Sequence, residues 1–230
     1  MTDTHSWKSR LTTTVVMELA AALSGLVMVL FVLGHLCGNL LLFMGPGVFN
    51  AYAAHLQALG PLLAVVRLAM VSALLVHVAM TVWLRLLGLG AAGPGRYAVS
   101  ARRARKGFGT RTMIYTGLLI LCFLLLHVYD FTFADKTGAR SVLHGQGMGL
   151  YGVVFNGFAD PPRAAFYTLA VCAVGLHLSH LLSSLWVTLG VLADRATPGA
   201  DFTARAAGAA VALGFTAIPL YVLIKTRLLH

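Results

Sequence analysis

The residues of this sequence best suited to chemistry are histidines inside long apolar segments. One lies near the middle of each of four segments, and a fifth follows three residues after the last: His35, His77, His127, His177 and His180. Coordinating side chains are rare within membrane spans because hydrocarbon offers them no water. One such histidine could simply be a packed imidazole bonded to a neighbouring helix. Four on four segments instead favour haem, whose iron takes neutral imidazole as an axial ligand between facing helices of a bundle.

The segments that carry these histidines predict an all-α integral membrane protein with five transmembrane helices. Of the 230 residues, 59% are apolar and 10% are charged, whereas soluble domains are about 25% charged. A helix needs about 20 apolar residues to cross a hydrocarbon core about 30 Å thick. We expect one membrane domain, residues 1–230, whose spans cover residues 15–44, 61–89, 112–133, 163–192 and 203–224. We expect the first four helices to form a bundle around two haems and the fifth to pack peripherally.

Basic residues between the spans predict the orientation in the membrane. The formal net charge is +10, but the basic residues flank apolar runs instead of forming an amphipathic face, which argues against nucleic-acid binding. The loop between the second and third spans is the most basic one, with Arg96, Arg102, Arg103, Arg105 and Lys106. The positive-inside rule therefore places this loop and the N-terminus in the cytoplasm and the C-terminus outside. Residues 134–162 then form a polar and aromatic outer loop, whose Gly-rich and Tyr-containing stretches are compatible with a short helix at the interface; the sequence does not fix its structure.

The depth of each histidine in the membrane predicts which two histidines bind the same iron. His35 lies nine residues before the outer end of its span and His127 six residues before the outer end of its own, about 14 and 9 Å inside at 1.5 Å per residue. His77 and His177 lie twelve and fifteen residues before inner ends, about 18 and 22 Å from the cytoplasmic side. The first pair is therefore predicted to bind an outer haem and the second pair an inner haem.

His177 and His180 cannot both bind the same iron, because residues three apart on a helix face the same way whereas axial ligands approach from opposite sides. Small residues adjoin two of the histidines, namely Gly34, Cys37 and Gly38 near His35, and Gly175 and Ser179 near His177. They could make room for a flat porphyrin or serve ordinary helix packing in a membrane. An iron with two histidine ligands has no open coordination position, which favours one-electron transfer over oxygen chemistry.

Several motifs, spread over nearly the whole chain, resemble those of a known family. They cover residues 33–39, 45–55, 111–113, 126–130, 151–158 and 175–180 with 188–190. With these motifs the chain resembles the five-helix, di-haem cytochrome b membrane anchor of succinate dehydrogenase and fumarate reductase. The resemblance implies that His35 and His127 bind the outer haem b and that His77 and His177 bind the inner one. His180 is then left to contact a propionate or to support a ligand.

The resemblance also implies partners. A flavoprotein subunit with FAD and an iron-sulfur subunit would dock on the cytoplasmic face, and menaquinone would be the electron partner in the membrane. The chain would be a subunit of a succinate-oxidising or fumarate-reducing enzyme of the respiratory chain without holding the dicarboxylate site itself. The bacterial cytoplasmic membrane is the expected location, and a dimer of the whole complex stays open.

The residues that serve quinone and the haem propionates are predicted less sharply. Arg111, at the inner end of the third span, suits a propionate because guanidinium pairs bidentately with carboxylate. The quinone candidates lie near the outer haem, apart from one acidic residue at the inner end of the first span: Asp130, Tyr129, His55, Gln57 and Glu18. Asp130 could instead cap a helix end, and His55 could be an ordinary surface residue. Some anchors of this type carry a carboxylate early in the second helix, but residues 50–67 contain no Asp or Glu.

Two other functions are compatible with the same residues. One is the cytochrome b subunit of a hydrogenase, formate dehydrogenase or nitrate reductase. The other is a haem-free transporter or scaffold whose histidines relay protons or pack the bundle. The sequence shows no mid-helix Gly/Pro interruption repeated in two halves, which argues against a transporter.

Overall fold

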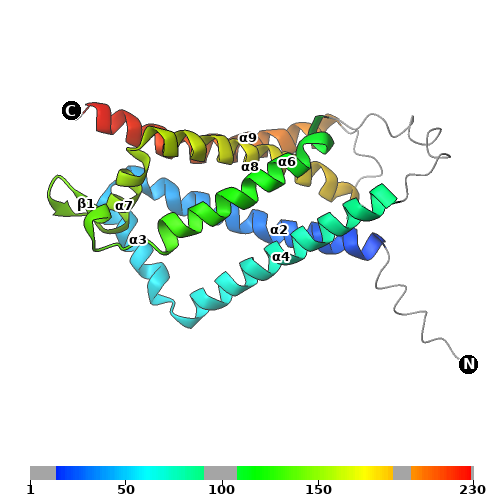
Figure 1. The fold of residues 1–230 in the computed structure, drawn as a ribbon, viewed down its shortest axis with the longest axis horizontal. Coiled ribbons are helices and arrows are strands. Elements are labelled where there is room, and N and C mark those ends of the chain that lie inside the picture. Colours follow the sequence, from blue (N-terminus) through cyan, green and yellow to red (C-terminus); the bar gives the residue numbers. More distant parts are fainter. Residues whose placement is uncertain (1–13, 91–107, 189–197, 229–230) are drawn as a thin grey trace, which may run out of the picture.

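The computed structural model describes residues 14–90, 108–188 and 198–228, and five long helices dominate this part of the chain (Figure 1). They are α2 (Thr14–Leu40), α4 (Pro61–Gly90), α6 (Phe108–His127), α8 (Pro161–Thr188) and α9 (Pro198–Leu228). Each is long and apolar enough to cross a membrane, over Thr14–Met44, Pro61–Leu87, Thr112–Thr132, Pro161–Leu185 and Pro198–Arg227. The prediction of an all-α protein with five helices long and apolar enough to span a membrane is confirmed. The basic residues of the 91–107 loop lie outside the described residues.

Proline and glycine set the helix boundaries. Proline is the first residue of α4, α8 and α9 and of the short helix α3 (Pro46–Ala58), where its missing N–H costs nothing. Gly45 and Gly60 have φ of 96° and 52°, in the left-handed region that glycine adopts without strain. Gly45 follows the 3-10 turn η1 (Leu41–Met44), and Gly60 separates α3 from α4. These turns therefore occur where the sequence predicts breaks between spans.

Several hydroxyl groups inside the long helices are satisfied within their own helix. Ser24, Thr81, Thr116 and Thr226 each donate to the carbonyl four residues earlier, at 2.7 to 3.0 Å. This local bonding leaves no free hydroxyl donor at these positions, as an apolar surrounding requires.

The end of the molecule opposite the start of α2 carries a cover of short elements (Figure 1). It contains α3, the π-helical turn η3 (Val128–Thr132), the turn η4 (Ala139–Ser141), a hairpin of β1 (Val142–Leu143) and β2 (Gln146–Gly147), and α7 (Gly149–Phe158). The 134–162 loop therefore contains a short helix, α7, which the sequence leaves as a possibility, and also a hairpin that the sequence does not predict. Most of α7 is buried, including Tyr151 and Val153. Asn50 of α3 accepts the Tyr151 N–H at 3.1 Å and donates to the Met148 carbonyl at 2.9 Å, so it caps α7 from another part of the chain.

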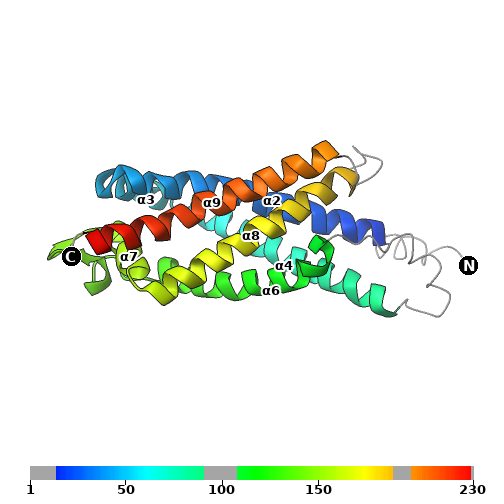
Figure 2. The ribbon, with the colours of Figure 1, turned by 90° about the horizontal axis from the view of Figure 1, so that it is seen from above.

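The helices pack unequally. The α8 helix packs most extensively against α9, α2 lies against α4, and α6 lies against α8 (Figure 2). Ala204, Val211, Ile218 and Val222 of α9 are buried. In contrast, no residue in the most apolar stretch of α4 is buried. The expectation of a peripheral fifth helix is therefore wrong, because small residues of α9 bring it tightly against α8, and α4 is the helix with the least protein around it.

Candidate functional site

The structure brings the four central histidines together in two pairs. The imidazole centroids of His35 on α2 and His127 on α6 are 5.7 Å apart. Those of His77 on α4 and His177 on α8 are 6.3 Å apart. In both pairs the rings stand nearly perpendicular, with interplanar angles of 87° and 69°. The members of each pair are those that depth in the membrane predicts, although they come from helices far apart in the sequence.

The ring positions fit two axial ligands of one iron. Imidazoles on opposite sides of a metal, each with a nitrogen about 2 Å from it, have centroids about 6 Å apart. All four histidines are only half-buried although they face one another inside the bundle. Among the described residues no group of three or more His, Cys, Asp or Glu side chains gathers as for a bare metal ion. Two imidazoles at each site match the two ligands that a porphyrin iron takes from the protein.

Hydrogen bonds to Nδ1 orient both imidazoles of the inner pair, His77 and His177. His77 Nδ1 is 2.9 Å from the carbonyl oxygen of Ala21, to which it donates. His177 Nδ1 lies 3.0 Å from the Thr116 hydroxyl, whose own proton is directed to the carbonyls of its helix. Both rings thus have Nδ1 engaged and Nε2 left for a ligand, the arrangement that fixes tautomer and orientation in metal-binding histidines.

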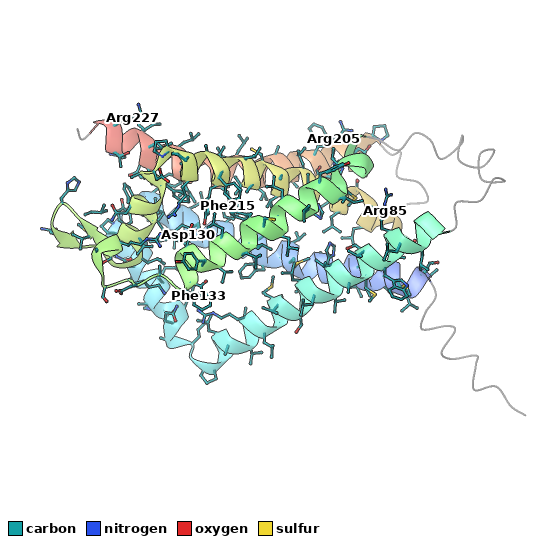
Figure 3. The ribbon with its side chains drawn as sticks, in the orientation of Figure 1. Arg85, Asp130, Phe133, Arg205, Phe215 and Arg227 are labelled. Carbon is teal, nitrogen blue, oxygen red and sulfur yellow. The ribbon has the colours of Figure 1, made fainter. Side chains whose placement is uncertain are left out.

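Aromatic side chains surround the outer pair. Phe31 stacks on His35 with centroids 5.4 Å apart. Phe123 and Phe131 each lie 5.4 Å from the His127 ring, and Phe215 of α9 lies 5.9 Å from the His35 ring (Figure 3). His127 Nδ1 is buried without a hydrogen-bond partner among the described residues. The outer pair is therefore held mainly by ring packing, and the inner pair by hydrogen bonds.

Two glycines that the sequence does not single out lie against the inner pair. A Cβ on Gly25 would be 3.3 Å from the His77 ring, and one on Gly117 would be 3.5 Å from the His177 ring. Near the outer pair, a Cβ on Gly34 would meet nothing within 4 Å. Glycine at these positions keeps the surroundings of the imidazoles open.

Three of the other small residues near the predicted ligands serve helix packing. Gly38 lies against the Tyr52 ring, and Gly175 lies against the Gly208 carbonyl of α9. Ser179 contacts the same glycine of α9. For these three, the structure supports the helix-packing alternative, because each is the contact point of a second helix, as small residues in membrane proteins often are.

Asp130 lies in a buried ionic cluster, neither at a free helix end nor at a surface open to a quinone. It is 1% exposed, and the Tyr167 hydroxyl donates to its Oδ2 at 2.9 Å. Arg163 and Arg140 approach its Oδ1 to 3.5 and 3.8 Å. Tyr129, the next residue back, is 67% exposed on the outside of the bundle. The two are therefore not brought together, since consecutive residues point to different sides of the turn.

The remaining predicted residues are dispersed. His55 and Gln57 are exposed on α3, and Glu18 is exposed near the start of α2. His180 lies near Asp201 and Arg205 of α9, and its Nε2 is buried without a hydrogen-bond partner among the described residues. Arg111 lies in the first turn of α6, and its side chain is outside the described part of the structure.

Comparisons of the chain with protein-family models, curated proteins and solved structures find no match.

Proposed function

We propose that this chain is the membrane anchor and electron-transfer subunit of a succinate:quinone oxidoreductase, a succinate dehydrogenase or fumarate reductase. The observation that carries the proposal is the pair of facing imidazoles at each of two levels, contributed by four membrane-spanning helices. Two haems b held there would supply one-electron transfer, because bis-histidine iron has no open position. The succinate or fumarate site would lie in a partner subunit.

The roles proposed for this chain's residues are to hold and orient the two irons. His35 and His127 serve the outer site, and His77 and His177 serve the inner site. The Ala21 carbonyl and the Thr116 hydroxyl hold the inner rings so that Nε2 faces the bundle interior. The phenyl rings of Phe31 and Phe123 exclude water from the outer site and restrict how its imidazoles turn.

The proposed partners follow the expectation from the sequence. A flavoprotein subunit and an iron-sulfur subunit dock on the cytoplasmic side, menaquinone exchanges electrons in the bilayer, and the complex resides in a bacterial cytoplasmic membrane. His55, Gln57 and Tyr129 are the candidates for quinone contact that are exposed near the outer end. Asp130 is too deeply buried for direct contact with a quinone.

Haem stoichiometry in alanine variants tests the two sites. The pyridine haemochrome assay on the cofactor-replete complex should give two haems b per chain. His35→Ala and His127→Ala should each remove the same haem in a redox titration, and His77→Ala and His177→Ala should remove the other. His144→Ala, at an exposed hairpin turn, should keep both. A replete wild-type chain with fewer than two haems would contradict the proposal.

The partner subunits separate the proposed complex from other respiratory complexes. Covalently bound flavin in a subunit that co-purifies with this chain supports succinate or fumarate chemistry. Nickel or molybdenum in the co-purified complex would instead identify a hydrogenase, formate dehydrogenase or nitrate reductase and overturn this part of the proposal.

A further inference from the structure

The ionic cluster around Asp130 has an unbalanced positive charge. It contains one carboxylate and two guanidinium groups, those of Arg140 and Arg163, and the Tyr167 hydroxyl. The Asp130 carboxylate is buried, whereas the side chains of Arg140 and Arg163 are 39% and 33% exposed and stay partly solvated. The cluster therefore carries one positive charge more than its carboxylate balances, which leaves a guanidinium able to pair with a further anion.

Unpartnered atoms mark where that anion would bind. Arg140 Nη2 is buried and makes no hydrogen bond, and the same holds for Asp130 Oδ1. The distances of 3.8 and 3.5 Å between the arginine nitrogens and Oδ1 are ionic contacts, too long for good hydrogen bonds. A guanidinium has five N–H donors arranged to receive a carboxylate in bidentate fashion. One donor, Arg140 Nη2, is thus shielded from solvent and has no hydrogen-bond partner among the described residues.

Tyr167 connects this cluster to the outer histidine pair. Its hydroxyl is bonded to Asp130, and its ring centroid lies 6.2 Å from that of His127. The same ring packs against Phe131 and Phe123 with centroids 5.8 and 5.2 Å away. The cationic cluster is therefore the immediate neighbour of the outer site, on the side that faces away from the inner histidine pair.

We propose that Arg140 and Arg163 bind a carboxylate of the outer cofactor, a propionate of its porphyrin. This inference rests on the proposed function. Asp130 is a positioning residue: it holds the two guanidinium groups side by side, and Tyr167 holds Asp130. The outer site would thereby be fixed at two places, by its imidazoles at the iron and by the arginine pair at the ring edge.

Redox titration of Arg140→Gln and Arg163→Gln tests the proposal in the purified complex. Positive charge near an iron favours its reduced state. Each variant should therefore lower the midpoint potential of the haem that His35→Ala removes and leave the other potential unchanged. Lys136→Gln, which removes a cation from the same outer loop, should leave both potentials unchanged.

A vibrational measurement reports on the carboxylate directly. Redox-difference infrared spectra with haem ¹³C-labelled in its propionates should show a labelled band from the outer haem that shifts in Arg140→Gln and Arg163→Gln, and in Asp130→Asn, but not in Lys136→Gln. Selective loss of the outer haem in the arginine variants would also support the proposal. Unchanged propionate bands and potentials in both arginine variants would overturn it while leaving two haems in place. Absence of haem from the wild-type chain would instead refute the proposed function.

Discussion

At the level of single residues, the two histidine pairs differ in how the second ring nitrogen is held. His77 and His177 each have a hydrogen-bond partner for Nδ1, whereas His127 Nδ1 has none among the described residues. Such partners orient a ligand and increase its affinity for metal. The inner imidazoles are therefore more strongly preorganised than the outer ones.

Thr116→Val should weaken haem binding at the inner site, because it removes the acceptor for His177 Nδ1. Loss of such a partner lowers metal affinity by about 10-fold to 100-fold. The rate at which haem leaves the purified chain for excess apomyoglobin should rise for one haem only. Thr226→Val is a matched control, since the Thr226 hydroxyl bonds only to carbonyls of its own helix. Equal haem release from both variants would contradict the role assigned to Thr116.

Tyr151 on α7 limits the stability of the cover of short elements at alkaline pH. Burial, followed by the nearby Tyr221, raises the pKa of Tyr151 from 10.0 to about 12. A group whose pKa is higher in the folded state contributes its full stability below the unfolded pKa and loses it as pH rises. The cover should therefore lose stability between about pH 10 and pH 12. Near-ultraviolet circular dichroism should follow this loss, and Tyr151→Phe should reduce its pH dependence.

How much of the site the sequence predicts depends on the type of contact. Depth alone pairs His35 with His127 and His77 with His177, because a helix has a constant rise per residue. Contacts that cross between helices are different. The sequence does not show that Gly25 faces His77 or that Arg163 faces Asp130, since both depend on how each helix is rotated about its axis.

At the level of elements, the α8 and α9 helices are joined through glycine. A Cβ on Gly208 would overlap the Gly175 carbonyl, and a Cβ on Gly175 would lie 2.5 Å from the Gly208 carbonyl. The absence of a histidine from the fifth span suggested a peripheral helix, but a missing ligand says nothing about packing. The relevant sequence signal is Gly208 followed four residues later by Ala212, a spacing of small residues typical of close membrane helices.

Gly208→Ala should force α8 and α9 apart. Overpacking of this kind costs about 1–3 kcal/mol, so the midpoint of thermal unfolding in detergent should fall. Gly199→Ala in the first turn of the same helix should be nearly neutral, because a Cβ there meets nothing within 4 Å. Equal midpoints for the two variants would show that the helices tolerate the extra methyl group.

At the level of the whole molecule, the start of α2 and the end of α9 lie at opposite ends of the long axis (Figure 1). This agrees with an odd number of spans, and the five predicted apolar segments begin within five residues of the apolar helices because apolar length is a direct physical requirement of the bilayer. Which end faces the cytoplasm rests on the charges of residues 91–107, outside the described residues.

Cysteine labelling tests that orientation. In a chain with Cys37, Cys122 and Cys172 replaced by alanine, His144→Cys at the outer hairpin should react with a membrane-impermeant maleimide in intact cells. Arg85→Cys, exposed near the other end of the bundle, should react only after the membrane is permeabilised (Figure 3). The reverse pattern would invert the predicted topology.

The bond between Asn50 and α7 has a consequence for biogenesis. The partners Asn50 and Met148 are 98 residues apart, and a ribosome adds about 5–20 residues per second. For some seconds, therefore, the first two apolar helices can be complete while the Asn50 amide has no partner in α7. The cover of short elements can assemble at this end of the bundle only after α7 has been synthesised, so its packing is a late event in the folding of the chain.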